Sequence, residues 1–155
     1  MQQIAVFASG EGTNFEAITS ACERKELNAR VALLVCDKPN APCITRAKKY
    51  GIPTFAFSPK DYANKSEYEA EIVALLKEAD VSLICLAGYM RIVGEKLLSA
   101  YEGKIINIHP SLLPAFRGAR AVEQAIEYGV KVFGITIHWV DTSLDGGRII
   151  AQKAF

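Results

Sequence analysis

The sequence predicts an α/β protein built on a mostly parallel sheet with helices on both faces. Short β-branched runs alternate with amphipathic stretches along its 155 residues, which is the pattern of βαβ units. The first of these runs are almost uniformly apolar, as expected of strands that helices cover on both sides. No repeat, low-complexity segment or linker interrupts the chain, so we expect a single domain over residues 1–155.

The predicted strands are short apolar runs at regular intervals. The first four are nearly uniform, whereas the fifth and sixth alternate apolar and polar residues, and the chain ends within a further apolar run at 149–155. In chain order the six predicted strands are residues 4–8, 31–36, 54–57, 83–87, 105–109 and 135–139.

Helix starts are marked by two capping-box patterns. In each, a Thr13 or Ser66 hydroxyl would cap the helix and a glutamate three residues later would bond back to it. The second helix would place Tyr68, Ile72, Leu75, Leu76 and Ala79 on one face. Shorter helices are predicted at 44–50, 95–101 and 121–128, with loops at 37–40 and 110–118.

Composition excludes several classes of protein. With 50% hydrophobic residues, 23% charged residues and a formal charge of +1, the chain is neither disordered nor basic enough for a nucleic-acid footprint. The longest apolar stretch, residues 81–93, is too short and interrupted to span a membrane, and the N-terminus lacks a signal peptide's basic region. Four cysteines without a C-x-x-C pair indicate free thiols, no metal site and a cytoplasmic protein.

A glycine-rich turn, Ser9-Gly10-Glu11-Gly12-Thr13-Asn14, lies between the first predicted strand and helix. Its backbone N–H groups and the positive end of the helix dipole would favour a phosphate. A plain βα turn with Thr13 as N-cap would show the same pattern. Because Phe15 replaces the third glycine of a dinucleotide fingerprint, one phosphate is favoured over a pyrophosphate, although Asp37 stands where a ribose-binding acid could lie.

Asn107 and His109 emerge together from the carboxyl end of the predicted strand 105–109. Side chains two residues apart share a face of a strand, and Pro110 ends the ladder. Open α/β sheets bind their ligands at this end. An amide beside an imidazole suits stabilisation of an oxyanion, although a hydrogen-bonded structural histidine would fit too.

His138 and Asp145 follow on the last predicted strands. Alternation places His138 on the same face as Thr136 and Val140, where it could be a partly buried structural imidazole or a site residue. Asp145 begins an Asp-Gly-Gly turn and could bond only its own backbone. If it instead faces His109, its charge favours the protonated imidazole, which suits a general acid in the attack of an amine on a carbonyl carbon.

Four motifs, in this order, resemble the glycinamide ribonucleotide formyltransferase family, also called the phosphoribosylglycinamide formyltransferase family. The motifs are the turn at residues 9–14, the run Leu-Ala-Gly-Tyr-Met-Arg-Ile at 86–92, the segment 107–114 and the Asp-Gly-Gly at 145–147. The resemblance runs from residue 4 to residue 155. It implies a three-layer, Rossmann-like formyltransferase fold.

The resemblance also implies formyl transfer from 10-formyltetrahydrofolate to the amino group of glycinamide ribonucleotide, in purine synthesis. These small molecules are the implied partners of a monomer or homodimer, without metal, nucleic acid or membrane. His109 would donate a proton and Asp145 would keep it protonated, while Asn107 and His109 would meet the oxyanion of a tetrahedral intermediate. The ribonucleotide phosphate would lie at Gly12, Thr13 and Asn14, and folate at Lys65, Met90, Arg91, Ile92, Val93 and Asn107.

Three residues depart from the family pattern, and the chain is shorter than its relatives. Arg117 and Arg148 replace prolines that are common in relatives, and Lys65 replaces a frequent arginine. Lys65, Arg91 and Arg117 are candidates for binding the tail of a polyglutamylated folate. Because relatives continue past Phe155 with a part that supplies an acid near the substrate amine, we expect a domain that lacks the family's C-terminal part.

Other functions fit parts of the pattern. Methionyl-tRNA formyltransferase shares the Asn-x-His and Ser-Leu-Leu-Pro signature, but the phosphate-type turn and the low basic charge speak against it. Formyltetrahydrofolate deformylase shares a related triad but has an N-terminal regulatory domain. A non-catalytic nucleotide-binding module would keep only the fold, and a NAD-dependent oxidoreductase is indicated only by Gly10, Gly12 and Asp37.

Overall fold

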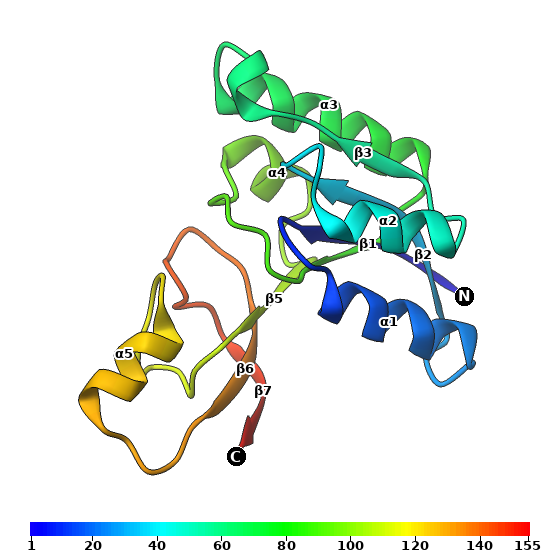
Figure 1. Ribbon diagram of the computed structural model, residues 1–155. Helices are drawn as coiled ribbons and strands as arrows, with labels where there is room; N and C mark the ends of the chain where they lie inside the picture. Colours follow the sequence, from blue (N-terminus) through cyan, green and yellow to red (C-terminus); the bar gives the residue numbers. More distant parts are fainter.

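The computed structural model describes residues 1–155 and contains one seven-stranded sheet with the order β3-β2-β1-β4-β5-β6-β7 (Figure 1). The first five strands in chain order are parallel, whereas β6 runs antiparallel to both of its neighbours. The predicted fold class is therefore confirmed, and each strand lies within two residues of its predicted bounds. The strands are β1 (Gln2–Ala8), β2 (Ala29–Cys36), β3 (Thr54–Ala56), β4 (Leu83–Leu86), β5 (Ile105–His109), β6 (Gly134–Trp139) and β7 (Ile149–Ala154).

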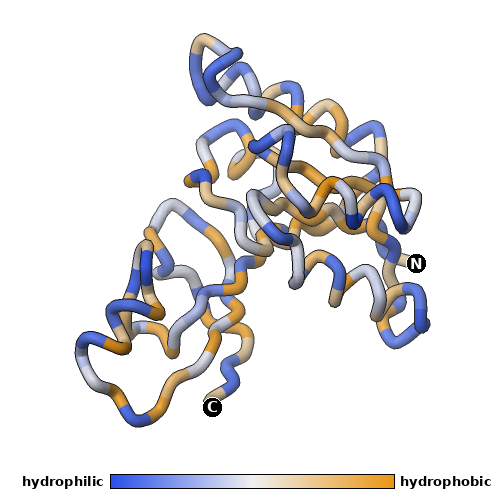
Figure 2. Tube along the Cα trace, in the orientation of Figure 1, coloured by the Kyte–Doolittle hydropathy of each residue, from blue (hydrophilic) through white to orange (hydrophobic).

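Helices cover both faces of the parallel part of the sheet. Phe15 of α1 and Cys43 of α2 lie in one buried cluster, and Ile72 of α3 and Leu97 of α4 lie in the other. Figure 2 shows the central strands as largely apolar segments, as strands between two helical layers should be. The helices are α1 (Thr13–Glu23), α2 (Pro42–Lys49), the 3₁₀ turn η1 (Pro59–Asp61), α3 (Lys65–Glu78), α4 (Glu95–Ala100) and α5 (Ala121–Tyr128).

Both predicted capping boxes are wrong in detail. The residue before α1 is Gly12, in the left-handed conformation with φ 75°, and no side chain caps the helix. α3 begins before Ser66, because Asn64 Oδ1 accepts a bond from the Glu67 N–H at 3.0 Å. The Glu67 carboxylate in turn accepts a hydrogen bond from the Ala63 N–H. A pair of bonds like that of a capping box therefore forms two residues earlier than predicted.

The topology brings the candidate site residues to one edge of the sheet. The strand order reverses between β1 and β4, so the loops after these strands diverge, which opens a crevice at their carboxyl ends. β5 ends at the same edge. In the β5–β6 ladder Asn107 lies opposite His138 and His109 lies opposite Thr136, which places all four side chains on one face, as their alternation predicts.

The part of the molecule around β6 and β7 is packed less tightly than the rest. The two buried apolar clusters contain no residue of α5, β6 or β7, and all six residues of β7 are exposed. Figure 1 shows these elements on one side of β5 and the helices α1 to α4 on the other. None of the helices has the length and apolar character that crossing a bilayer requires. The four cysteines are free thiols, as predicted.

Candidate active site

A polar cluster of four side chains lies at the carboxyl end of β5. Asp145 reaches across the site so that its Oδ2 lies 3.6 Å from His109 Nδ1 and its Oδ1 lies 3.9 Å from His138 Nε2. The Asn107 amide nitrogen is 3.3 Å from His138 Nε2. Both histidines are buried, and 12% of the Asp145 side chain is exposed, so this carboxylate is only slightly hydrated.

Hydrogen-bond partners assign the proton of His138. Its Nδ1 lies 2.9 Å from the Trp139 carbonyl oxygen, which can only accept, so Nδ1 carries the hydrogen. In the neutral ring Nε2 is then an acceptor, and it receives one N–H of the Asn107 amide. The second N–H of that amide has no protein acceptor, so His138 orients Asn107 and leaves one donor for a ligand.

His109 faces an oxygen at both ring nitrogens. Its Nε2 donates to the Phe116 carbonyl at 2.8 Å, while its Nδ1 faces Asp145. The doubly protonated ring is the form in which both nitrogens point hydrogens at an acceptor. The arrangement therefore suits a histidine that enters a reaction as an acid.

Asp145 is held in place by the loops on either side of it, not by its own turn. Its Oδ2 accepts a 2.7 Å hydrogen bond from the Gly118 N–H. Asp145 therefore does not bond only the backbone of its own turn. The loop begins with Asp141, whose pKa is lowered by hydrogen bonds from the Ser143 hydroxyl and N–H. It returns at Gly147, where a Cβ would lie 1.7 Å from the Trp139 carbonyl oxygen, so only glycine allows this approach.

Thr136 is a buried residue that supports the site and that sequence reasoning did not nominate. Its hydroxyl donates to the Ser111 carbonyl at 2.7 Å and accepts from the Leu113 N–H at 3.0 Å. Gln152 donates to the same hydroxyl at 3.0 Å. These bonds tie the segment after His109 to β6 and β7. Thr136 could have been found from its position opposite His109 in the β5–β6 ladder.

The glycine-rich turn adopts a form that fits an anion. Gly12 is buried with φ 75°, and a Cβ there would lie 2.5 Å from the Cβ of Cys43, so the turn packs directly on α2. Thr13 and Asn14 are exposed at the start of α1, which has no side-chain cap. Their N–H groups therefore remain open to a ligand such as a phosphate.

The segment 90–93 offers an apolar surface next to the crevice. Met90 and Ile92 are each 70% exposed, whereas Val93 is buried. Lys65 Nζ donates to the Ile92 carbonyl at 2.6 Å. Glu69, predicted as the glutamate of the Ser66 capping box, is instead a buried carboxylate that accepts from the Gly94 N–H at 2.8 Å and fixes the end of this segment.

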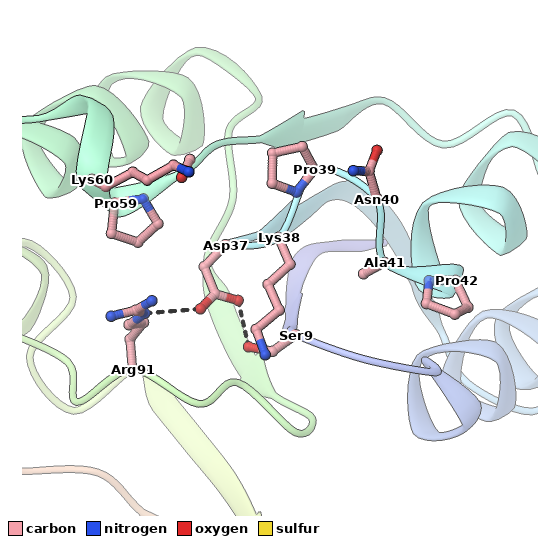
Figure 3. A pocket seen from close by; sticks show the side chains of 11 residues that line it. Ser9, Asp37, Lys38, Pro39, Asn40, Ala41, Pro42, Pro59, Lys60 and Arg91 are labelled. Atoms are coloured by element: carbon pink, nitrogen blue, oxygen red, sulfur yellow. Dashed lines mark hydrogen bonds and ion pairs between the residues drawn. The ribbon is translucent and has the colours of Figure 1, made fainter.

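A buried carboxylate connects the two candidate binding segments (Figure 3). Asp37 accepts a 2.5 Å bond from the Ser9 hydroxyl and pairs with Arg91 Nε at 2.9 Å. The Ser9 hydroxyl also accepts from the Met90 N–H at 2.8 Å. Because the Asp37 side chain is completely buried and both its oxygens are engaged, it is not available to a ribose, which removes the main support for a dinucleotide site.

Arg117 and Arg148 contribute main-chain contacts near the site. The Arg117 carbonyl accepts from the Gln124 side chain at 3.1 Å, and the Arg148 carbonyl accepts from the Trp139 N–H at 2.9 Å. Neither side chain bonds to the cluster around His109. No group of three His, Cys, Asp or Glu side chains is arranged to hold a metal ion.

The fold and the cluster are those of an α/β enzyme, and comparison with known families identifies its class. The profile of the formyl transferase family matches residues 2–155. The chain belongs to this family.

Individual relatives are more specific. A phosphoribosylglycinamide formyltransferase from Bacillus subtilis is 58% identical over 154 residues, which cover 99% of this chain and 79% of the relative. The crystal structure of glycinamide ribonucleotide transformylase 1 from Geobacillus kaustophilus superposes with a TM-score of 0.97 at 56% identity and covers 99% of this chain and 82% of the other. The human trifunctional purine biosynthetic protein adenosine-3 is 38% identical over 152 residues, which are 98% of this chain and 15% of that protein.

Proposed function

We propose that this chain is an enzyme that transfers the formyl group of 10-formyltetrahydrofolate to the amino group of glycinamide ribonucleotide, a step of purine biosynthesis. The observation that carries the proposal is Asp145 placed between His109 and His138, with the Asn107 amide held by His138. Relatives named for the same transfer support it. We take residues 1–155 as one formyltransferase domain acting on small molecules, with a single sheet in support.

The reaction requires hydrogen-bond donors that stabilise a negatively charged oxygen, and a path for one proton. The substrate amine attacks the formyl carbon, and the carbonyl oxygen becomes an oxyanion. The free N–H of Asn107 and a ring N–H of His109 are the donors on this face of the sheet. The new C–N bond forms, the bond to the folate nitrogen breaks, and one proton passes from the amine to that nitrogen.

His109 would present its Nε2–H to the substrate, because Nδ1 faces Asp145. In the structure the Phe116 carbonyl accepts this hydrogen. The reacting oxygen would therefore take the place of the Phe116 carbonyl, which requires a small movement of the loop at residues 110–118. Asp145 would stabilise the protonated ring before the transfer.

Each substrate has a surface suited to it. The turn at Gly12, Thr13 and Asn14 would hold the ribonucleotide phosphate with backbone N–H groups. The folate would lie against the segment 90–93, with Lys65 ordering its backbone and Asn107 at the formyl end. The loop 141–145 would close over the pterin. These roles follow the family motifs, and Thr13, Asn14, Met90 and Ile92 are exposed, as such contacts require.

A spectrophotometric transfer assay tests the proposal, with a 10-formyl folate as donor and glycinamide ribonucleotide as acceptor. His109→Ala should lower kcat by about 10²- to 10⁴-fold, and Asn107→Ala by about 10²- to 10³-fold. The exposed Asn28 offers a matched control, and Asn28→Ala should leave the rate unchanged. Near-native turnover of His109→Ala, or formate release that needs no ribonucleotide, would contradict the proposal.

A further inference from the structure

Helix α2 binds two carbonyl oxygens of the glycine-rich turn. The Cys43 N–H at the start of α2 donates to the Gly10 carbonyl at 3.0 Å. Three residues later, Arg46 Nε donates to the Glu11 carbonyl at 2.6 Å. Successive carbonyls of the turn therefore point toward α2. Arg46 is the one side chain that bonds to the main chain of residues 10–12.

The direction of these carbonyls sets the direction of the N–H groups. The C=O and N–H of a trans peptide point opposite ways, and the one cis bond of the structure is at Leu113–Pro114. The N–H groups of Glu11 and Gly12 therefore point away from α2, and neither donates to an acceptor in the protein. Together with the uncapped N–H groups at the start of α1, they form a row of donors of the kind that binds anions.

Arg46 is itself held by Glu16, which belongs to the helix that follows the turn. One oxygen of the Glu16 carboxylate accepts from the Arg46 guanidinium, and the other accepts from Lys49 Nζ at 3.1 Å. The bonds from Arg46 and then Lys49 lower the pKa of Glu16, so this carboxylate stays ionised. The Arg46 guanidinium thus joins α1 to the turn, and a carboxylate compensates its charge.

We propose that Arg46 is a positioning residue for the ribonucleotide phosphate, because its bond to the Glu11 carbonyl fixes the Gly12 N–H in the direction from which it donates to that phosphate. The inference rests on the proposed function, which assigns the phosphate to this turn. Without the bond, the peptide between Glu11 and the conformationally free Gly12 can rotate, and its carbonyl oxygen would then repel the anion.

Two substitutions separate the hydrogen bond from the charge. In Arg46→Gln, the amide Nε2 is as many bonds from Cα as the arginine Nε, so this variant keeps a neutral donor. Arg46→Met has a similar length and no donor. Arg46→Met should raise the dissociation constant for glycinamide ribonucleotide about tenfold, the size expected for one lost hydrogen bond to a charged group, whereas Arg46→Gln should stay within about threefold of the wild type.

The effect should be confined to the phosphate. Glycinamide riboside, which lacks it, should bind equally to the wild type and both variants, and kcat at saturating ribonucleotide should not change. Lys49→Met is the matched control, because it removes the other cation on Glu16 and no bond to the turn. It should bind the ribonucleotide as the wild type does.

Three results would overturn the inference. Native affinity of Arg46→Met for the ribonucleotide would show that the bond to Glu11 is not needed. Equal weakening in Arg46→Met and Arg46→Gln would assign the effect to charge. Equal weakening of ribonucleotide and riboside would assign it to a general loss of structure.

Titration with ribose 5-phosphate tests the inference without turnover. Binding that weakens in Arg46→Met and persists in Arg46→Gln, in a protein that transfers no formyl group, would support the role of Arg46 and contradict the proposed function. Formyl transfer with equal affinities in all variants would leave the proposed function standing and overturn the role of Arg46. Failure of the wild type to bind either phosphate ester would overturn both.

Discussion

The orientation of one amide, that of Asn107, depends on which nitrogen of His138 carries a proton. Trp139 accepts from Nδ1, so Nε2 accepts from Asn107. The sequence left the role of His138 open between a structural and a functional residue. The structure places it within the cluster, bonded to Asn107, and in the proposed mechanism it would act as a positioning residue through that amide.

His138→Ala should lower kcat about fivefold with little change in either KM, because one net hydrogen bond of about 1 kcal/mol orients the amide. His138→Gln can accept the same bond through its side-chain oxygen and should recover most of the rate. Steady-state kinetics of both variants measure this. A native rate for His138→Ala would show that Asn107 needs no such support.

Cys43 gives a prediction on stability at high pH. Burial, followed by the hydrogen bond with Cys36, raises the pKa of this thiol from 9.0 to about 12. Above about pH 9 the unfolded chain loses this proton while the folded chain keeps it, so the stabilisation is complete below pH 9 and is lost as the pH rises through 12.

The comparison with Cys43→Ala isolates this effect from other groups that titrate at high pH. Between about pH 8 and pH 10.5, the difference in unfolding free energy between the wild type and the variant should shrink by about 2 kcal/mol. Urea unfolding at the two pH values measures it. A difference that stays constant would show that the thiol titrates normally in the folded protein.

At the scale of elements, the packing of the glycine-rich turn on α2 accounts for the failure of the Thr13 capping box. Cys43 lies so close to Gly12 that the chain enters α1 through a left-handed residue, and the Thr13 hydroxyl stays exposed. This contact joins residues 31 positions apart, so no local pattern reports it. The cap of α3, by contrast, lies two residues earlier than predicted, because Asn64 has extended backbone and its side chain accepts from the Glu67 N–H.

Gly12→Ala should destabilise the fold by about 2–4 kcal/mol, since it combines a left-handed backbone with overpacking against Cys43. It should also raise the KM for the ribonucleotide at least tenfold. Gly10→Ala is the matched control, because a Cβ there meets no atom within 4 Å. Thermal unfolding and substrate titration compare the two variants. Equal stability and equal affinity of both variants would contradict the packing argument.

Asp37 joins three elements, since it holds the loops after β1 and β4 from the end of β2. Asp37→Ala should raise the KM for the folate substrate about tenfold, because the carboxylate loses both its ion pair with Arg91 and its hydrogen bond from Ser9, with kcat changed only a few-fold. Asp37→Asn keeps a hydrogen-bond acceptor, so its KM should lie between those of the wild type and Asp37→Ala. A fall in kcat with an unchanged KM would assign Asp37 a different role.

For the whole molecule, periodicity predicts the strands and helices well because β1, β2 and β4 are buried between two helical layers. The site is predicted in part: alternation puts Asn107, His109 and His138 on one face, and the register confirms it. The bond from Gly118 to Asp145, the support from Thr136 and the burial of Asp37 could not be predicted, because each depends on how separate loops meet.

The unequal packing of the two parts predicts unfolding in stages. Trp139, the only tryptophan, lies in β6, outside both buried apolar clusters, whereas α1 to α4 supply most of the helix signal. Tryptophan fluorescence should therefore change at a lower urea concentration than circular dichroism at helical wavelengths. Coincident curves would show that the molecule is one cooperative unit.

β5 stands at the boundary between these parts and carries Asn107 and His109, while their partners His138 and Asp145 come from the looser side. Warming would therefore separate the acid from its carboxylate before the central strands melt. Heat inactivation should begin below the melting temperature of the fold and reverse on cooling, so the upper working temperature of the enzyme is governed by the β5–β6 ladder.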